Sequence, residues 1–374
     1  MMTKPRYMKP FSEQELKALG TKPGFFPGMA PSFIFNTPIS YRENVMNTFM
    51  DKRPCFAVSN RDFTHMNCDY FQAHLGRGGR ANPNFTDAFG VKWTFEPTAG
   101  GSISVGGNPR FVDVNDWKDA IKMPDVNNWD WAADAEKNKV NTDFAVLMTP
   151  TNGFWFERLI SLMDFMNAAM ALVDEDQYDA LHELFEATTQ LGCDMIDKIC
   201  EYWPSVDGFT LHDDWGSQRE PFFSDEVARE LFLPHMKKLV GHIHDKGRFC
   251  MLHSCGHIED RLPVLIEAGL DSWEMQANAN DIYKCYEKYG DQIVLQVTIP
   301  EFDPNDEKAC VQAARDYVDN FCKPGKPTMI LSRNGMGSKV FAEEPDIRLA
   351  LAAALFNVII RLASLISSTS ICDI

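Results

Sequence analysis

The sequence lacks the features of several protein classes. Its ten cysteines include no C-x-x-C pair, and the first residues, Met-Met-Thr-Lys-Pro-Arg, carry no apolar core of a secretion signal. We therefore expect a cytoplasmic protein with reduced thiols. The longest apolar stretch, Leu349–Ile366, is interrupted by Asn357 and Arg361. This pattern predicts a buried helix rather than a membrane span.

Positively charged residues are also fewer than negatively charged ones. The chain has 36 Lys and Arg against 53 Asp and Glu, a formal net charge of −17. Such a balance argues against nucleic acid or an anionic membrane as a partner, and leaves small molecules and other proteins. Hydrophobic residues make up 45% of the 374 residues and aromatic residues 12%. That supply is enough for a sizeable folded core.

Apolar strands alternate with amphipathic helices along most of the chain. Strands are expected at 54–59, 144–148, 206–212, 249–253, 272–276, 293–297 and 328–332, and helices at about 37–50, 152–173, 177–201, 224–246, 258–268, 279–289 and 305–321. Continuous apolar strands separated by helices are typical of a parallel sheet covered on its faces. Because no nucleotide-binding fingerprint accompanies this many units, the pattern predicts an α/β fold, a closed (β/α)8 TIM barrel. We expect one barrel domain over 41–374 and an N-terminal arm over 1–40.

One strand-helix-strand segment carries three metal-ligand side chains. His253 and Cys255 are two residues apart at a strand end, so their side chains point to the same side. Glu274 comes at the end of the next expected strand. Imidazole, thiolate and carboxylate are ligand types of a catalytic zinc with an open position. The alternative is a core cysteine and a hydrogen-bonded histidine; the strand-end location and Glu274 favour the zinc interpretation.

Other polar residues follow the ends of the expected strands, where the functional residues of a barrel lie. Asp213 and Asp214 are adjacent, so an extended strand cannot direct both to one side, and a catalytic or a structural role is open for each. We expect one of them to orient the substrate or handle a proton. The candidates for substrate binding are Trp215, Gln218 and Arg333. The glycine cluster Gly76-Arg-Gly-Gly-Arg80 could cradle an anion, but a flexible turn is the favoured interpretation.

Two motifs carry a resemblance to a known family. His-Ser-Cys-Gly-His-Ile, preceded by Asp-Asp-Trp-Gly-Ser-Gln-Arg-Glu-Pro-Phe-Phe-Ser, resembles the uroporphyrinogen decarboxylase superfamily, and within it the zinc- and corrinoid-dependent methyltransferases. The similarity extends from Thr37-Pro-Ile-Ser-Tyr-Arg-Glu through Asp87-Ala-Phe-Gly-Val to the last expected helix, and so covers most of the chain. It implies a (β/α)8 barrel in which the His-x-Cys pair, here His253 and Cys255, binds zinc. In a related methionine synthase barrel a glutamate of the next strand is a further ligand, and Glu274 is similarly placed.

The resemblance implies a methyltransferase that moves a methyl group between a small methylated compound and the cobalt of a separate corrinoid protein. The segment Ser332-Arg-Asn-Gly-Met-Gly337 lacks the cysteine that thiol-methylating members carry near the last strand. This difference and the aromatic residues near the strand ends favour an aryl methyl ether as donor, in an O-demethylase reaction. A homodimer is compatible with the sequence. The alternative is uroporphyrinogen decarboxylase, which is disfavoured because Ala57–His65 contains a single arginine where that enzyme has an arginine-rich signature.

Overall fold

The structure is a computed structural model. It describes residues 14, 17–22, 32–97, 101–151, 153–298, 312–313, 316–317, 319–323 and 325–331, and the statements below concern these residues. The predicted helices at 305–321 and 349–366 and the candidate Arg333 therefore fall largely or wholly outside the described residues. Among the helices that are described, none combines the length and the apolar character needed to cross a membrane.

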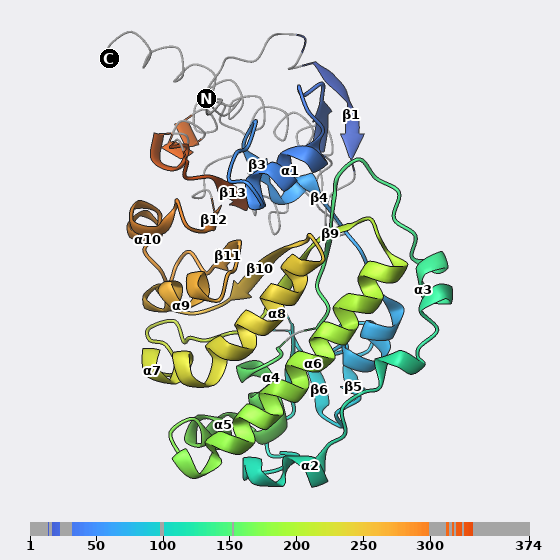
Figure 1. The fold of residues 1–374 in the computed structure, drawn as a ribbon, viewed down its shortest axis with the longest axis vertical. Coiled ribbons are helices and arrows are strands. Elements are labelled where there is room, and N and C mark those ends of the chain that lie inside the picture. Colours follow the sequence, from blue (N-terminus) through green and yellow to red (C-terminus); the bar gives the residue numbers. More distant parts are fainter. Residues whose placement is uncertain are drawn as a thin grey trace. The chain divides into compact units, whose positions relative to one another are not determined.

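Eight strands pair in a single sheet, and Figure 1 labels most of them. Its strands are β3 (Val58–Ser59), β4 (Phe63–His65), β8 (Ala145–Met148), β9 (Val206–His212), β10 (Phe249–Ser254), β11 (Ser272–Met275), β12 (Val294–Thr298) and β13 (Thr328–Leu331). Their order is β3-β13-β12-β11-β10-β9-β8-β4, so the first strand lies next to the last. The neighbours β9–β10, β10–β11, β12–β13 and β13–β3 pair parallel. This order confirms the predicted α/β class and the (β/α)8 barrel.

The chain divides into two compact units. The first unit comprises Met1–His65, Thr142–Val146 and Asp281–Ile374, and the second comprises Met66–Asn141 and Leu147–Asn280. The first unit contains the antiparallel hairpin β1 (Ala18–Lys22) and β2 (Ser32–Phe35), and the helices α1 (Tyr41–Phe49) and α10 (Ile282–Tyr289). The predicted N-terminal arm thus includes a hairpin. Helix α1 begins where the Ser40 side chain accepts a hydrogen bond from the Glu43 backbone, which satisfies a free amide of the first turn.

Two long helices cover β9 and β10 in the second unit. Helix α6 (Tyr178–Tyr202) buries apolar residues at three- and four-residue spacing, and α8 (Leu233–Asp245) packs beside it (Figure 1). The remaining helices of this unit are α2 (Trp117–Ala120), α3 (Trp131–Lys137), α4 (Phe156–Met163), α5 (Phe165–Ala171), α7 (Asp225–Val227) and α9 (Leu262–Glu267). Ser224 caps the start of α7, as the sequence predicts, by accepting from the Val227 amide. The strands themselves are buried on both faces, which explains their continuous apolar sequence.

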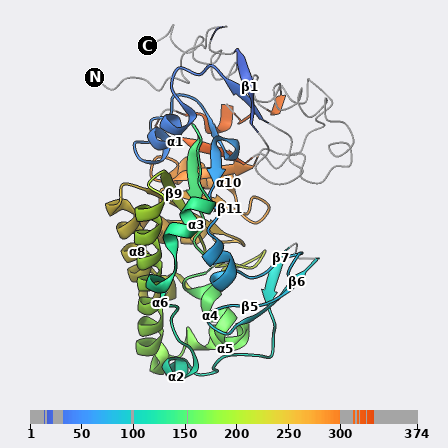
Figure 2. The ribbon, with the colours of Figure 1, turned by 90° about the vertical axis from the view of Figure 1, so that its right-hand side faces the viewer.

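A small antiparallel sheet lies between β4 and β8, in a part of the chain where no strand is expected from the sequence. It consists of β5 (Asn84–Thr86), β6 (Lys92–Glu96) and β7 (Gly101–Ser104), and Figure 2 shows β6 and β7 as neighbours. Asp87 fixes the turn between β5 and β6, because its carboxylate accepts hydrogen bonds from the amides of Phe89 and Val91 and from the indole of Trp93. Arg158 forms a buried ion pair with the same carboxylate at 2.9 Å.

Candidate metal centre

Three titratable side chains stand in one row across neighbouring strands. The parallel register pairs His253 of β10 with His212 of β9 on one side and with Glu274 of β11 on the other. Paired residues of adjacent strands point to the same side of a sheet, so the register places all three together. The two imidazole rings stack with centroids 4.6 Å apart and planes inclined by 19°. The row is therefore a direct consequence of strand pairing.

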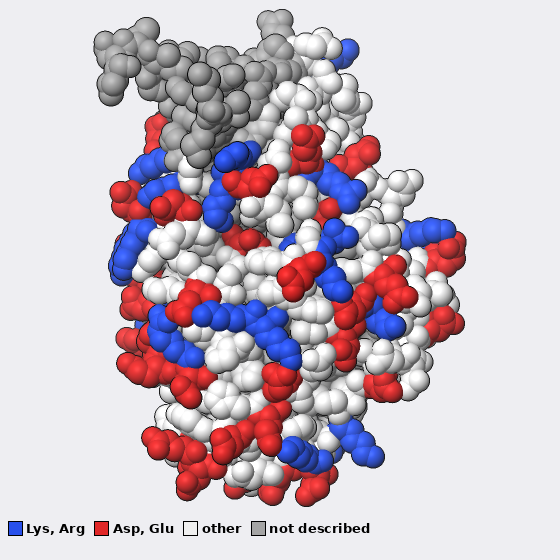
Figure 3. All heavy atoms as spheres, viewed as in Figure 1, with Lys and Arg blue, Asp and Glu red and all other residues white. Residues whose placement is uncertain are grey.

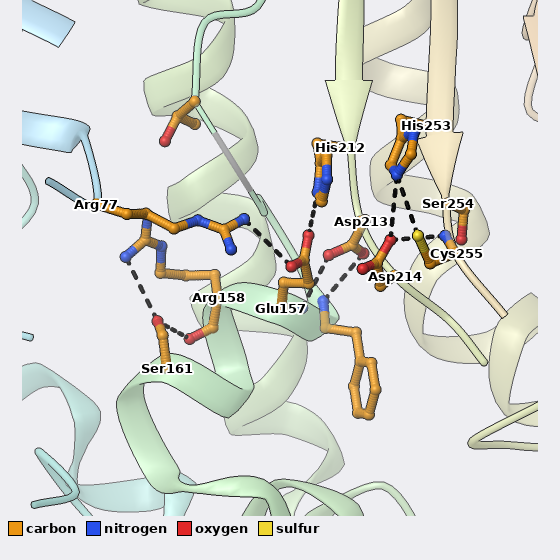
Figure 4. A network of polar contacts seen from close by, with 12 residues as sticks. Arg77, Glu157, Arg158, Ser161, His212, Asp213, Asp214, His253, Ser254 and Cys255 are labelled. Carbon is orange, nitrogen blue, oxygen red and sulfur yellow. Dashed lines mark hydrogen bonds and ion pairs between the residues drawn. The ribbon is translucent and has the colours of Figure 1, made fainter. Parts of the chain in front are cut away.

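A second pair of side chains lies two residues further along. Asp214 follows β9, and Cys255 follows β10. The Asp214 carboxylate accepts a hydrogen bond from the Cys255 amide at 2.7 Å. The Cys255 sulfur is 3.2 Å from His253 Nε2, and the same nitrogen is 3.9 Å from Asp214 Oδ1. Figure 4 shows His253, Asp214 and Cys255 converging at the ends of the two strands.

These side chains form a donor set suited to a metal ion. His212, Asp214 and His253 each offer one ligand atom, and the three atoms lie within 4.8 Å of one another. Cys255 adds a sulfur beside His253 Nε2. Two imidazoles, a carboxylate and a thiol are ligands that zinc accepts in proteins, whereas magnesium and calcium take oxygen ligands. The residues present therefore fit the zinc that the sequence analysis expects.

Glu274 was expected to be a metal ligand beside Cys255, but its carboxylate contacts the other ring nitrogen of His253. Its carboxylate is 3.2 Å from His253 Nδ1, while Cys255 lies at Nε2. The lone pairs of the two imidazole nitrogens point away from each other, so an ion between Nε2 and the sulfur is not within reach of this carboxylate. The cause is the register, which sets Glu274 beside His253 in the same row. In this arrangement Glu274 orients the ring, and Asp214 is the carboxylate next to Cys255.

Hydrogen bonds of His253 determine its protonation. Burial alone lowers the pKa of this imidazole, but the hydrogen bonds to Cys255 and Glu274 more than offset that effect and hold the pKa well above its ordinary value. The raised pKa favours the protonated ring, which can donate to both neighbours. A metal ion at Nε2 takes the place of that proton, as is usual when histidine becomes a ligand.

His212 is held by a carboxylate of its own. Glu157 of α4 lies 2.5 Å from His212 Nδ1 and 3.2 Å from the guanidinium of Arg77. Although burial raises the pKa of Glu157, the contacts with His212 and Arg77 lower it to about 2. An ionised carboxylate only accepts hydrogen bonds, so Nδ1 carries the hydrogen and Nε2 remains for an ion.

Asp213 is buried and has a structural role, because it anchors the start of α4. Its side chain is fully buried and accepts hydrogen bonds from the amides of Phe156 and Glu157 at 3.1 and 2.8 Å and from the Trp215 indole at 2.9 Å. It thereby satisfies the free amides at the start of α4. Burial and the nearby Glu157 raise the pKa of Asp213 to about 7. Of the two adjacent acids, Asp214 is the one beside the candidate centre.

The expected substrate-binding residues have different environments. Trp215 is fully buried and packs against Phe223 and Phe232, so its ring is unavailable to a substrate, which corrects the expectation. Gln218 is exposed and exchanges hydrogen bonds of 2.8 and 3.1 Å with Gln276. The Gln276 oxygen also accepts from the Gly256 amide, next to Cys255. Gln218 is thus close to the centre, and Arg333 lies outside the described residues.

The sequence reasoning named Asp214 only as a catalytic candidate and did not include His212, Glu157 or Arg77. His212 and Asp214 have the same two-residue spacing at a strand end as His253 and Cys255, so one rule applied to both strands would have found them. Glu157 and Arg77 carry no comparable signal, because Glu157 contacts His212 from α4 and Arg77 contacts Glu157 from a loop. Only the tertiary structure brings them together.

Comparisons with known proteins found similarity only among solved structures. No family model matches the sequence, and no curated protein matches it. Among solved structures, a methyltransferase from Methanosarcina mazei is similar at 13% identity, with a TM-score of 0.47 over 84% of this chain and 82% of that chain. A Xanthomonas albilineans dihydropteroate synthase with 4-aminobenzoic acid is similar at 13% identity, with a TM-score of 0.23 over 49% of this chain and 83% of that chain.

Proposed function

We propose that this chain is a zinc-dependent methyltransferase that moves a methyl group between a small methylated compound and the cobalt of a separate corrinoid protein. The observation that carries the proposal is the convergence of His212, Asp214 and His253 at the ends of β9 and β10, with the Cys255 sulfur 3.2 Å from His253 Nε2. The motif around His253 and Cys255 contributes the reaction class, because it resembles zinc- and corrinoid-dependent methyltransferases.

The proposed ligand set balances the charge of the ion. Cys255 and Asp214 supply one negative charge each, and the two imidazoles are neutral when they bind a metal. A zinc ion held by these residues would supply Lewis-acid chemistry to an ether oxygen or a thiol. Glu274 and Glu157 keep the imidazoles in the tautomer with the hydrogen on Nδ1.

The neighbourhood of the centre favours a polar substrate. Of the aromatic side chains that favoured an aryl ether, Trp215, Phe223 and Trp273 are buried and Phe222 is half-buried. The polar side chains next to Cys255 are instead the amides of the exposed Gln218 and the half-buried Gln276. An amide presents both a donor and an acceptor, so this pair suits a substrate with a hydroxyl, carboxylate or amide group.

Metal analysis and a methyl-transfer assay test the proposal together. The purified protein should contain about one zinc per chain, as expected for a single site with this donor set. His253→Ala and Cys255→Ser should remove both the zinc and the methyl transfer to a corrinoid protein. His242→Ala, which changes a histidine of α8 that contacts Asp197, serves as the control and should retain both. Full activity in metal-free protein would refute the proposal.

A further inference from the structure

A chain of contacts runs from a surface loop to His212. The guanidinium of Arg77 contacts Glu157 at 3.2 Å, and Glu157 contacts His212 Nδ1 at 2.5 Å (Figure 4). The side chains of Arg77 and Glu157 are largely buried, with exposed fractions of 20% and 15%. Because the His212 ring is fixed through Nδ1, its other nitrogen has a defined direction.

Glu157 is fixed at both ends. Asp213, next to His212 in the chain, accepts a hydrogen bond from the Glu157 amide at 2.8 Å and so attaches the first turn of α4 to the end of β9. The backbone of the preceding loop is joined to the same strand, because the Gly153 amide donates to the His212 carbonyl at 2.8 Å. The carboxylate that supports the imidazole thus belongs to a helix anchored on the imidazole's own strand.

Arg77 belongs to the glycine cluster that the sequence analysis left without a role. A side chain on Gly76 would place its Cβ 2.7 Å from the Gln72 carbonyl oxygen, and Gly78 has φ of +70°. Both positions therefore require glycine in this turn. The guanidinium of Arg77 lies 5.1 Å from the Trp93 ring, whose indole donates to Asp87. The turn directs this arginine toward Glu157.

We infer that Arg77 and Glu157 are positioning residues of the metal centre, which hold His212 with Nε2 available to the ion. This inference rests on the proposed function. Glu274 supports His253 in the corresponding way, so each imidazole has a carboxylate at Nδ1. Glu157 is also paired with the guanidinium of Arg77. Arg77 offsets its charge, and the centre gains an oriented ligand without a further net negative charge.

Binding of Co²⁺ to metal-free protein tests the inference without an activity assay. Glu157→Gln should weaken Co²⁺ binding by about 10- to 100-fold, the usual effect of losing an outer carboxylate, and should alter the visible spectrum of the bound ion. The charge-transfer band between the Cys255 thiolate and cobalt should persist, which shows that the site still assembles. Asp197→Asn is the matched control, since it removes a carboxylate from His242 at 2.9 Å on other elements, and should leave binding unchanged.

A double variant tests whether Arg77 acts through Glu157. Arg77→Met should change the affinity by a smaller factor than Glu157→Gln, and this change should disappear when Glu157 is already replaced. Equal affinity of Glu157→Gln and the unaltered protein, or additive effects in the double variant, would overturn the inference. If the unaltered protein shows no Co²⁺ site that His253→Ala abolishes, the proposed function itself fails.

Discussion

Two carboxylates contact His253 in different ways. Asp214 lies on the side of Nε2 and Cys255, whereas Glu274 contacts Nδ1. Asp214→Asn should therefore lower the zinc content of the purified protein far below one per chain. Glu274→Gln should retain the zinc with an affinity lower by about 10- to 100-fold, because it removes a support and no ligand. Zinc analysis and chelator competition measure both quantities. The reverse order would restore Glu274 as the ligand.

A buried aspartate in the first unit makes stability depend on pH. Asp62 is 2% exposed and accepts a hydrogen bond from the Ser59 amide at 2.8 Å. Burial raises its pKa to about 7, although Ser59, Lys22 and Arg61 act in the opposite direction. The folded state thus holds a proton that the unfolded state loses near pH 4. Stability from this group is present below pH 4 and is lost as the pH rises to 7, by up to about 4 kcal/mol.

Replacement of this aspartate isolates its contribution. Asp62→Asn keeps an oxygen for the Ser59 amide and removes the titration. The variant should gain stability relative to the unaltered protein as the pH rises from 4 to 7, and the difference should level off above pH 7. Urea denaturation at a series of pH values measures it. Parallel stability curves for the two proteins would contradict the assigned pKa.

Sequence reasoning at the residue scale succeeded where the rule was local. The two-residue spacing of His253 and Cys255 correctly predicted that their side chains meet, because alternation along a strand needs no knowledge of its neighbours. The position of Glu274 depends instead on register, which pairs it with His253 and brings its carboxylate to Nδ1. Register between parallel strands follows from the packing of their helices, and the sequence alone does not display it.

At the scale of elements, the loop after β9 and the loop after β10 cross beside the candidate metal centre. Gly256 has φ of +88°, and a Cβ there would lie 2.0 Å from the Gly216 carbonyl oxygen. The loops that carry Cys255 and Asp214 therefore touch backbone to backbone. Gly256→Ala should lower the free energy of unfolding by at least about 2 kcal/mol, because both the conformation and the contact oppose a side chain, and should reduce the zinc content. Thermal unfolding and metal analysis measure these effects.

A second glycine provides the comparison. Gly241 lies within α8, and nothing is within 4 Å of a Cβ built on it. Gly241→Ala should stabilise the protein by up to about 1 kcal/mol, since alanine favours the helix. If both substitutions had the same effect, the crossing of the loops would not be the cause.

The regular elements were the easiest to predict. The expected strand 206–212 coincides with β9, and the long helix expected at 177–201 is observed as Tyr178–Tyr202. Continuous burial and a steady helical period account for both. The predicted helix at 152–173 is two helices, α4 and α5, interrupted at Asp164 with φ of +63°. The small sheet β5–β7 was missed because its strands have only three to five residues among turns.

At the scale of the whole molecule, negative charge dominates. Figure 3 shows acidic side chains across the visible face with basic ones among them, in line with the net charge of −17. The proposed corrinoid partner must therefore dock against an acidic protein. The sequence predicted the acidic charge balance and the barrel. Both follow from the composition and from the order of strands and helices along the chain, which can be read without knowing the tertiary contacts. The division into two compact units was not evident from the sequence.

All the proposed metal ligands belong to the second unit. An ion that binds only the folded state stabilises it, by about 2.7 kcal/mol at a free concentration one hundred times the dissociation constant. Zinc should therefore slow amide hydrogen exchange in β9, β10 and β11, and leave α1 and α10 of the first unit unchanged. Exchange followed by mass spectrometry with and without zinc measures this, with His253→Ala as the control that should show no slowing. Equal slowing in both units, or none at the three strands, would be incompatible with a centre built at their ends.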